Sequence, residues 1–309
     1  MDLVLQVIVT GLAAGAGYGL LAVGLALIHR LTGVVHLALG ELVGLAVVVA
    51  LFVVSGSDLI ASSSVPAASV LAAGAAGVAV AGLAGAATYL LALRPFLRRG
   101  SALGWIGAVV AVAFAVRGLL SSVLVRDSYA VPDPFPLSGV GTDGRLLLGG
   151  GVTIPVRAFV VIAAGLVLAE AAARVLERSR WGRALQAVAA EPDGAHLVGL
   201  PVDRLLTGAF ALAGGLAALA AILQAPAGPF TADTGTLLGL KGLVAAVLVG
   251  FGSTRRAFAA GLLVGVTEAA VASLHLGPVR LGAPYRDLIP LALALVALGW
   301  RGRHARPAE

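Results

Sequence analysis

Residues 179–204 read SRWGRALQAVAAEPDGAHLVGLPVDR, and this stretch is the only long polar insertion with helical signals between otherwise near-continuous apolar segments. Leu185, Val188 and Ala189 recur at the spacing of one helix face, which predicts a short amphipathic helix. Pro192 is expected to end that helix, because the residue before a proline is sterically pushed away from the α-helical region. The first half of the stretch is therefore predicted to be a short helix that stops at a proline.

A second short helix is predicted in the rest of the stretch. Asp193 has the side chain of an N-cap residue, and Ala195 and Val198 follow at helical spacing, beside the small Gly199. Pro201 is expected to stop this helix before the next apolar segment begins. Two small amphipathic helices between apolar segments predict a docking surface on the inner face of a membrane protein.

Apolar runs recur along the remainder of the chain. Of its 309 residues, 60% are hydrophobic and only 12% are charged, and the mean hydropathy is +1.03. This composition is far more apolar than that of soluble domains, and it predicts an all-α polytopic membrane protein with about eight to nine transmembrane or re-entrant helices. No polar block is large enough to fold alone, so residues 1–309 are interpreted as a single transmembrane domain.

The charge and the cysteine content exclude several other classes of protein. The formal net charge is +6, but the basic residues lie at the ends of apolar segments and form no patch interleaved with aromatic residues. Nucleic acid is therefore not expected as a partner. The chain has no cysteine, which excludes disulfides and thiolate metal sites, and its five histidines are scattered singly, so no metal site is predicted.

Nine apolar segments follow one another along the chain. They are residues 3–28, 31–54, 65–93, 102–125, 153–176, 205–223, 235–252, 258–276 and 287–300. In the first of them, Gly11, Gly15 and Gly19 lie four residues apart and form a small-residue stripe, which predicts the close approach of another helix. Residues 126–151 form the longest loop, rich in proline and glycine, and are interpreted as external.

The basic residues predict the orientation of these segments. With the N-terminus outside and the C-terminus in the cytoplasm, 14 arginines flank the inner ends of the segments and 5 flank the outer ends. The outer five are Arg126, Arg145, Arg157, Arg280 and Arg286. Because cytoplasmic loops carry the excess of lysine and arginine, residues 179–204 are predicted to be cytoplasmic.

The same polar stretch resembles the cytoplasmic loop of permease subunits in bacterial ABC importers of the branched-chain amino acid (Liv) type. That loop has a Gly-Arg-Ala opening, an alanine-rich turn, an acidic residue and a small-residue segment with Leu and Gly. The residues at these positions are Gly182, Arg183, Ala184, Glu191, Ala195, Leu197 and Gly199. The resemblance implies that they couple the chain to two ATPase subunits, whereas the alternative is a solvated loop whose arginines only orient the protein.

Two further stretches carry the resemblance over most of the chain. They read GLAAGAGYGLLAVGLALIHRLTGVVHLALGE at residues 11–41 and GLKGLVAAVLVGFGSTRRAFAAGLLVGVTEA at residues 239–269. The family commonly has an Asn-Phe-Ala-His-Gly-Glu motif, but residues 36–41 read HLALGE, so only the Ala-Gly-Glu frame remains. Because of this departure, urea, short amides and other small polar solutes remain alternatives to branched-chain amino acids as the transported solute.

Glu41, Arg117, Lys241 and Glu268 are the candidate site residues within the apolar segments. A charge at the centre of a membrane helix costs about 2.5–3.5 kcal/mol, so such residues usually face the interior of a helix bundle or a cavity. They are predicted to line the solute path or to form pairs that hold the helices together. Glu41 and Lys241, which lie beside glycines in opposite halves of the chain, are expected to interact directly or through the translocation path.

The resemblance implies that the chain is the permease subunit of an ABC importer in a bacterial inner membrane. The resemblance implies that the chain forms half of a pore with a second, identical or homologous subunit and receives branched-chain or other small amino acids from an external solute-binding protein. The chain has no HExxH, GxSxG or Gly-Lys-Ser/Thr motif, so neither catalysis nor a bound cofactor is expected and partner subunits would use the ATP. A self-contained secondary transporter or channel and an intramembrane enzyme are the alternatives.

Overall fold

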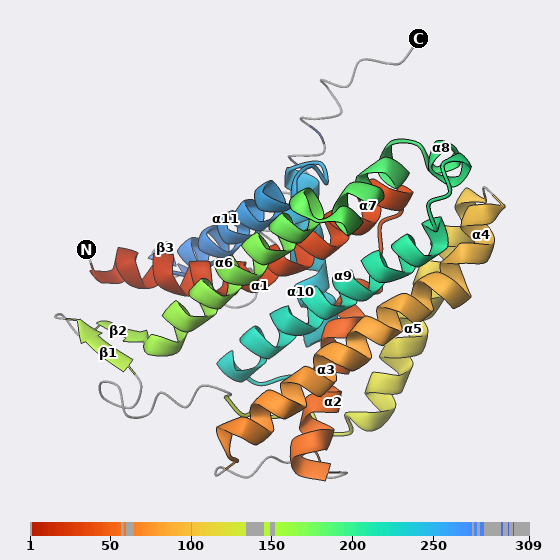
Figure 1. Ribbon diagram of the computed structural model, residues 1–309. Coiled ribbons are helices and arrows are strands. Elements are labelled where there is room, and N and C mark those ends of the chain that lie inside the picture. The colour runs from red at the N-terminus through yellow and green to blue at the C-terminus, as the bar shows by residue number, and fades with distance from the viewer. Residues whose placement is uncertain are drawn as a thin grey trace.

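The computed structural model describes residues 2–56, 59, 65–99, 101–133, 145–148, 152–273, 275–276, 279–280, 292, 296 and 299. Most of these residues are helical, which confirms the predicted all-α membrane fold (Figure 1). The longer helices are α1 (Asp2–Thr32), α2 (Leu39–Ser55), α3 (Ala67–Ala87), α5 (Ala102–Val123), α6 (Val156–Arg178), α9 (Val202–Gln224), α10 (Thr234–Leu248) and α11 (Thr254–Ser273). The shorter elements are η2 (Thr88–Leu93), α4 (Arg94–Arg98), α7 (Arg180–Ala190), α8 (Pro192–Leu197), η4 (Ala225–Ala227), β1 (Arg145–Leu148), β2 (Val152–Pro155), β3 (His275–Leu276) and β4 (Val279–Arg280).

The described helices account for the first eight predicted apolar segments. Within the part of the chain that the structure describes, six helical segments are long and apolar enough to cross a membrane, and α2 and α10 are shorter apolar helices. One of the six is α3, which continues through the π-helical turn η2 into α4. The ninth predicted segment, 287–300, and most of the predicted external loop 126–151 lie outside the described residues.

Several element boundaries differ from the prediction, including the start of α2, which lies at Leu39 and not at residue 31. Helix α1 continues through His29 and Arg30, so these residues do not separate the first two segments. Helix α6 begins at Val156, because the preceding residues form strand β2, which pairs with β1 in an antiparallel hairpin. The β-branched residues of Val-Thr-Ile at 152–154 favour an extended backbone, and Pro155 stands where the helix starts.

Helix α1 is the centre of the bundle and packs against α6, α9, α10 and α11. Its closest neighbour is α11, and the contact confirms the predicted small-residue stripe. A Cβ atom added at Gly15 would lie 2.7 Å from the carbonyl oxygen of Gly261, and one added at Gly265 would lie 2.5 Å from the Cα atom of Gly15. The two backbones therefore touch along this stripe, which only glycine allows.

Helices α2 and α10 cross at a second glycine contact. A Cβ atom added at Gly40 would lie 3.0 Å from the Cα atom of Gly239, and one added at Gly235 would lie 2.6 Å from the Gly40 carbonyl oxygen. Both helices are too short to span a bilayer alone, since about 20 residues are needed. Their crossing places the residues that follow Gly40 on α2 directly beside the first turns of α10.

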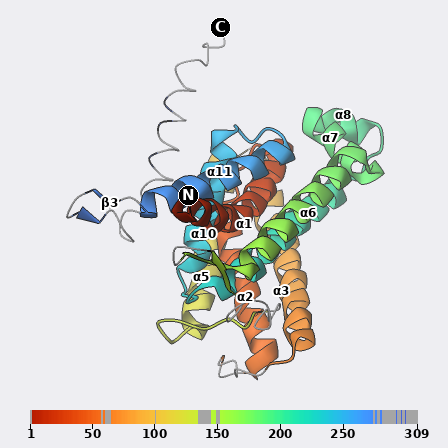
Figure 2. The same ribbon diagram turned by 90° about the vertical axis from the view of Figure 1, so that its left-hand side faces the viewer.

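Helices α7 and α8 extend from one end of the bundle, away from the β1–β2 hairpin (Figures 1 and 2). The predicted stop at Glu191-Pro192 is confirmed, because α7 ends at Ala190 and α8 begins at Pro192. The N-cap position of α8 is Glu191, however, and Asp193 lies in its first turn. The predicted helical face formed by Ala195 and Val198 is also wrong, because Ala195 is buried whereas Val198 is exposed.

Candidate functional site

The four charged residues predicted within the apolar segments form two separate groups. The first lies where α1, α10 and α11 meet: Lys241 Nζ is 3.0 Å from Glu268 Oε1, and both side chains are buried. The ammonium group also lies 3.5 Å from the Tyr18 hydroxyl and 5.4 Å from the centre of the Tyr18 ring. A buried ion pair of this kind holds its helices in register and is costly to break by removing one partner.

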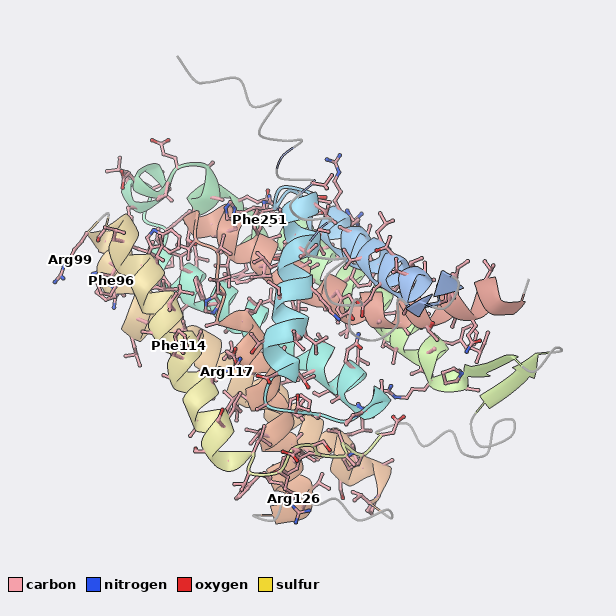
Figure 3. All side chains as sticks on the ribbon, turned by 180° about the vertical axis from the view of Figure 1, so that it is seen from behind. Phe96, Arg99, Phe114, Arg117, Arg126 and Phe251 are labelled. Atoms are coloured by element: carbon pink, nitrogen blue, oxygen red, sulfur yellow. The ribbon has the colours of Figure 1, made fainter. Side chains whose placement is uncertain are left out.

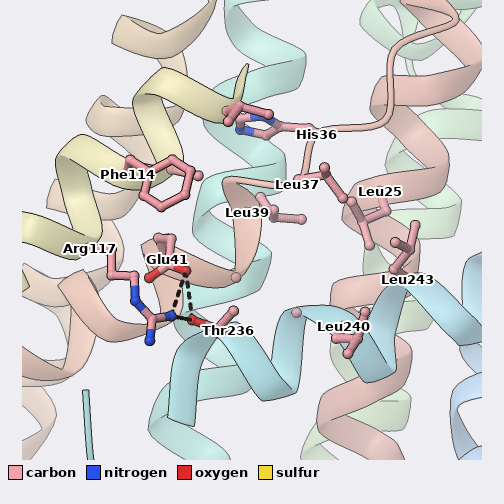
Figure 4. A pocket seen from close by; sticks show the side chains of 14 residues that line it. Leu25, His36, Leu37, Leu39, Glu41, Phe114, Arg117, Thr236, Leu240 and Leu243 are labelled. Carbon is pink, nitrogen blue, oxygen red and sulfur yellow. Dashed lines mark hydrogen bonds and ion pairs between the residues drawn. The ribbon is translucent and has the colours of Figure 1, made fainter. Parts of the chain in front are cut away.

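The second group joins α2, α5 and α10 (Figure 4). Thr236 donates a hydrogen bond of 2.7 Å to Glu41 Oε1, and Arg117 donates one of 2.6 Å to the Thr236 hydroxyl. Arg117 Nη1 is also 3.9 Å from Glu41 Oε1, and the other terminal nitrogen contacts Asp233. The threonine therefore links the carboxylate and the guanidinium across three helices.

The predicted direct interaction between Glu41 and Lys241 is wrong, since each residue pairs with a different partner. The reason is the face of α10 on which each partner lies. Thr236 and Lys241 are five residues apart, which separates them by about 140° around a helix of 3.6 residues per turn. Thr236 therefore faces α2 and α5, whereas Lys241 faces α1 and α11.

A cavity of about 380 Å³ lies beside the second group, between α1, α2, α5 and α10 (Figure 4). Glu41, Arg117 and Thr236 lie at one side of it, and its other walls are mainly apolar. His36 also lines this cavity and is only 1% exposed, and neither of its ring nitrogens has a hydrogen-bond partner among the described residues. His36 was not among the predicted site residues because the histidines are scattered singly along the chain, although its place at the start of the HLALGE motif is a signal in the sequence.

A second cavity of about 430 Å³ lies on the opposite face of α10 and reaches Lys241. Tyr18 and Gln224 contribute polar groups to its walls. The Gln224 amide donates a hydrogen bond of 2.6 Å to the Ala14 carbonyl, which ties α9 to α1 beside this cavity. Helix α10 therefore separates two cavities. Glu41 and Arg117 line the first cavity, and Lys241 lines the second.

The α7–α8 helix pair is built from the residues that carry the family resemblance. Ser179 caps α7 by accepting a 2.9 Å hydrogen bond from the Gly182 amide, and Leu185 and Val188 are buried beneath the helix as predicted. Of the seven predicted coupling residues, Gly182 and Ala195 are buried, Ala184 is partly buried, and Arg183, Glu191, Leu197 and Gly199 are exposed. Leu197 is 90% exposed and Val198 77% exposed, so the tip of the pair presents two large apolar side chains.

Two clusters of ion pairs hold the chain on either side of this helix pair. Before it, Arg255 of α11 pairs with Glu170 and Glu177 of α6, at 2.9 and 2.8 Å. After it, Asp203 at the start of α9 pairs with Arg94 at 2.8 Å and with Arg98 at 2.5 Å. Exposed ion pairs add little stability singly because water screens the charges, so we interpret these clusters as contacts that orient α6 and α9.

These features define a multi-pass helical membrane protein with cavities against buried charges and a helix pair that projects from the bundle, which is the architecture of a transport protein. Residues 7–298 match the model of the family described as branched-chain amino acid transport system / permease component, and the chain belongs to this family. The family is one of transport permeases and not of enzymes. Among the described residues, no group of three or more His, Asp or Glu side chains is placed to hold a metal ion.

Curated relatives cover nearly the whole chain. It is 30% identical to the high-affinity branched-chain amino acid transport system permease protein BraD of Pseudomonas aeruginosa, over 96% of this chain and 94% of the relative. It is 26% identical to the high-affinity branched-chain amino acid transport system permease protein LivH of Escherichia coli K12, over 95% of this chain and 92% of that protein. The solved structure of PsaBC from Streptococcus pneumoniae in complex with Fab is also similar, with a TM-score of 0.46 and 14% identity over 94% of this chain and 90% of that chain.

Proposed function

We propose that this chain is the membrane subunit of an ATP-driven importer of branched-chain amino acids. The observation that carries the proposal is the α7–α8 helix pair, whose exposed apolar tip stands at the end of the bundle on residues that match the family's coupling loop. Two relatives are named for branched-chain amino acid transport, which supports the solute class. The chain binds no cofactor of its own in this proposal, and ATP is hydrolysed by two separate ATPase subunits.

The remaining partners follow from the same proposal. A second permease subunit, identical or homologous, completes the pore, and an external solute-binding protein delivers the amino acid. ATP binding by the partner subunits would push on Leu197 and Val198, and the ion pairs of Arg255 and Asp203 would carry that movement into α6, α9 and α11. The moving helices would then open and close the path beside α10.

Replacing Leu197 with aspartate should abolish coupling to the ATPase subunits. The side chain is 90% exposed at the tip of the pair, so the change should not disturb the bundle, but a carboxylate buried in an apolar partner groove is strongly unfavourable. We expect at least a tenfold loss of ATPase co-purification and of leucine uptake, with normal folded yield. Gly199 is a less suitable position for this test, because its φ of +79° strains any other residue.

The matched control for this test is Val125→Asp, which makes the same change at a residue that is 84% exposed after the end of α5. Val125→Asp should retain the ATPase subunits at the wild-type level. Normal co-purification with Leu197→Asp would contradict the proposed coupling site. Leucine uptake by the wild-type chain alone, driven by an ion gradient, would support a secondary transporter instead.

The proposed orientation places the N-terminus outside and the α7–α8 pair in the cytoplasm. Arg126 lies at the opposite end of the bundle from Arg99, which is near α8 (Figure 3). Because the chain has no native cysteine, Arg126→Cys and Glu191→Cys each create one label site, and both positions are exposed. In intact cells an impermeant thiol reagent should label only Arg126→Cys; labelling of Glu191→Cys alone would show the reverse orientation.

A further inference from the structure

We propose that the cavity between α1, α2, α5 and α10 binds an α-amino acid with an apolar side chain, with the ammonium group on Glu41 and the carboxylate group on His36. This inference rests on the proposed function and adds the atoms that recognise the solute. The cavity has a volume of about 380 Å³, within the range of roughly 300–1,000 Å³ that is usual for small-molecule sites.

The first argument is the presence of buried polar atoms without partners at this cavity. Glu41 is 4% exposed and His36 is 1% exposed. In the described part of the chain, Glu41 Oε2 and both ring nitrogens of His36 have no hydrogen-bond partner. Buried polar atoms are normally paired, because losing contact with water without compensation is unfavourable. A bound polar molecule would supply the missing partners.

The second argument concerns which polar groups fit these atoms. The neighbouring oxygen of Glu41, Oε1, already accepts a hydrogen bond from Thr236 and lies 3.9 Å from Arg117 Nη1. Oε2 can therefore accept from a ligand, and an ammonium group supplies both donors and a positive charge. A ligand carboxylate would be repelled at Glu41 but can accept the N–H of His36, because a neutral imidazole carries one donor. The two free positions thus match the two ends of a zwitterion.

The third argument is the apolar wall that faces these polar groups. Leu25, Leu240 and Leu243 line the side of the cavity opposite Phe114, as Figure 4 shows. A branched aliphatic side chain gains from burial against them, at roughly 25 cal/mol per Å² of apolar surface. Urea or a short amide would place polar atoms against the same wall without partners, which is unfavourable. The cavity therefore selects an apolar amino acid over the alternative solutes.

The test measures the affinity of the full chain in lipid nanodiscs for three probes. Leucine carries both polar groups, isoamylamine lacks the carboxylate, and isocaproate lacks the ammonium group. We expect Glu41→Gln to weaken the binding of leucine and isoamylamine by about 10- to 100-fold, because a charged hydrogen bond is lost. The same variant should leave isocaproate binding unchanged. His36→Ala should show the converse pattern, with weaker binding of leucine and isocaproate only.

The matched control is Glu268→Gln, which neutralises a buried carboxylate that does not line this cavity. It should change none of the three dissociation constants, even if less protein folds, since a dissociation constant reports on the folded molecules alone. The inference is overturned if wild-type protein binds no leucine at millimolar concentration, or if Glu41→Gln weakens isocaproate as much as leucine. Leucine uptake by the assembled wild-type transporter would leave the proposed function standing in either case.

Discussion

Lys241→Met is expected to lower the stability of the protein by about 3–5 kcal/mol, because it removes the cation that lies 3.0 Å from the buried carboxylate of Glu268. Methionine has a similar volume and leaves the packing of α10 intact, so the loss should come from the uncompensated charge. The measurement is the folded yield and the apparent Tm of the purified chain in detergent. We expect a large fall in both.

The double variant Lys241→Met, Glu268→Gln is the control for this result. It removes both charges, and it should recover a substantial part of the loss, with an interaction energy of about 0.5–3 kcal/mol. The double variant Lys241→Met, Glu41→Gln should show no recovery, because Glu41 is bound to Thr236 on another face of α10. Recovery in the second double variant but not in the first would contradict the pairing described above.

Gly265→Ala is expected to disrupt the contact between α1 and α11. The added methyl carbon would lie 2.5 Å from the Cα atom of Gly15, whereas carbon atoms pack at about 3.5–4.0 Å. Because the obstructing atoms belong to the backbone, they cannot rotate away, and the two helices must separate. Overpacking typically lowers the free energy of unfolding by about 1–3 kcal/mol. We expect a loss at the upper end of that range, measured as a fall in the apparent Tm.

The control for Gly265→Ala is the same substitution at Gly118, an exposed position of α5 where an added Cβ atom has no neighbour within 4 Å. Alanine stabilises a helix relative to glycine by up to about 1 kcal/mol, so Gly118→Ala should raise the stability slightly. Equal Tm values for the two variants would show that the helices do not approach as closely as described.

Sequence patterns predicted much of the candidate coupling site because its signals are local. The proline at 192 separates two helices for a steric reason that involves neighbouring residues only, and α7 and α8 meet there. The burial of Leu185 and Val188 likewise follows from their spacing on one helix face. The predicted N-cap of α8 was wrong by two positions, because Pro192 occupies the first position of the helix, where its missing N–H needs no partner, and Glu191 precedes it without a side-chain capping bond.

The cavity and its partners could not be predicted in the same way. His36 lies in the connection between α1 and α2, and its burial depends on Phe210 of α9, whose ring centre is 5.4 Å from the histidine ring. Arg117 and Thr236 are 119 residues apart in the chain. No local pattern specifies such contacts, because they depend on how distant helices are placed against each other.

The sequence by itself determined that the chain is a helical membrane protein, that Glu41, Lys241 and Glu268 carry buried charge, and where a small-residue stripe permits close packing. Apolar run length, the cost of burying a charge and the size of glycine are properties of single residues and their near neighbours. Only the tertiary structure decided that Lys241 pairs with Glu268 and that Glu41 lies by a cavity with His36. One face of α10 lies against α2 and α5 and another lies against α1 and α11, and this packing assigns each charge its partner.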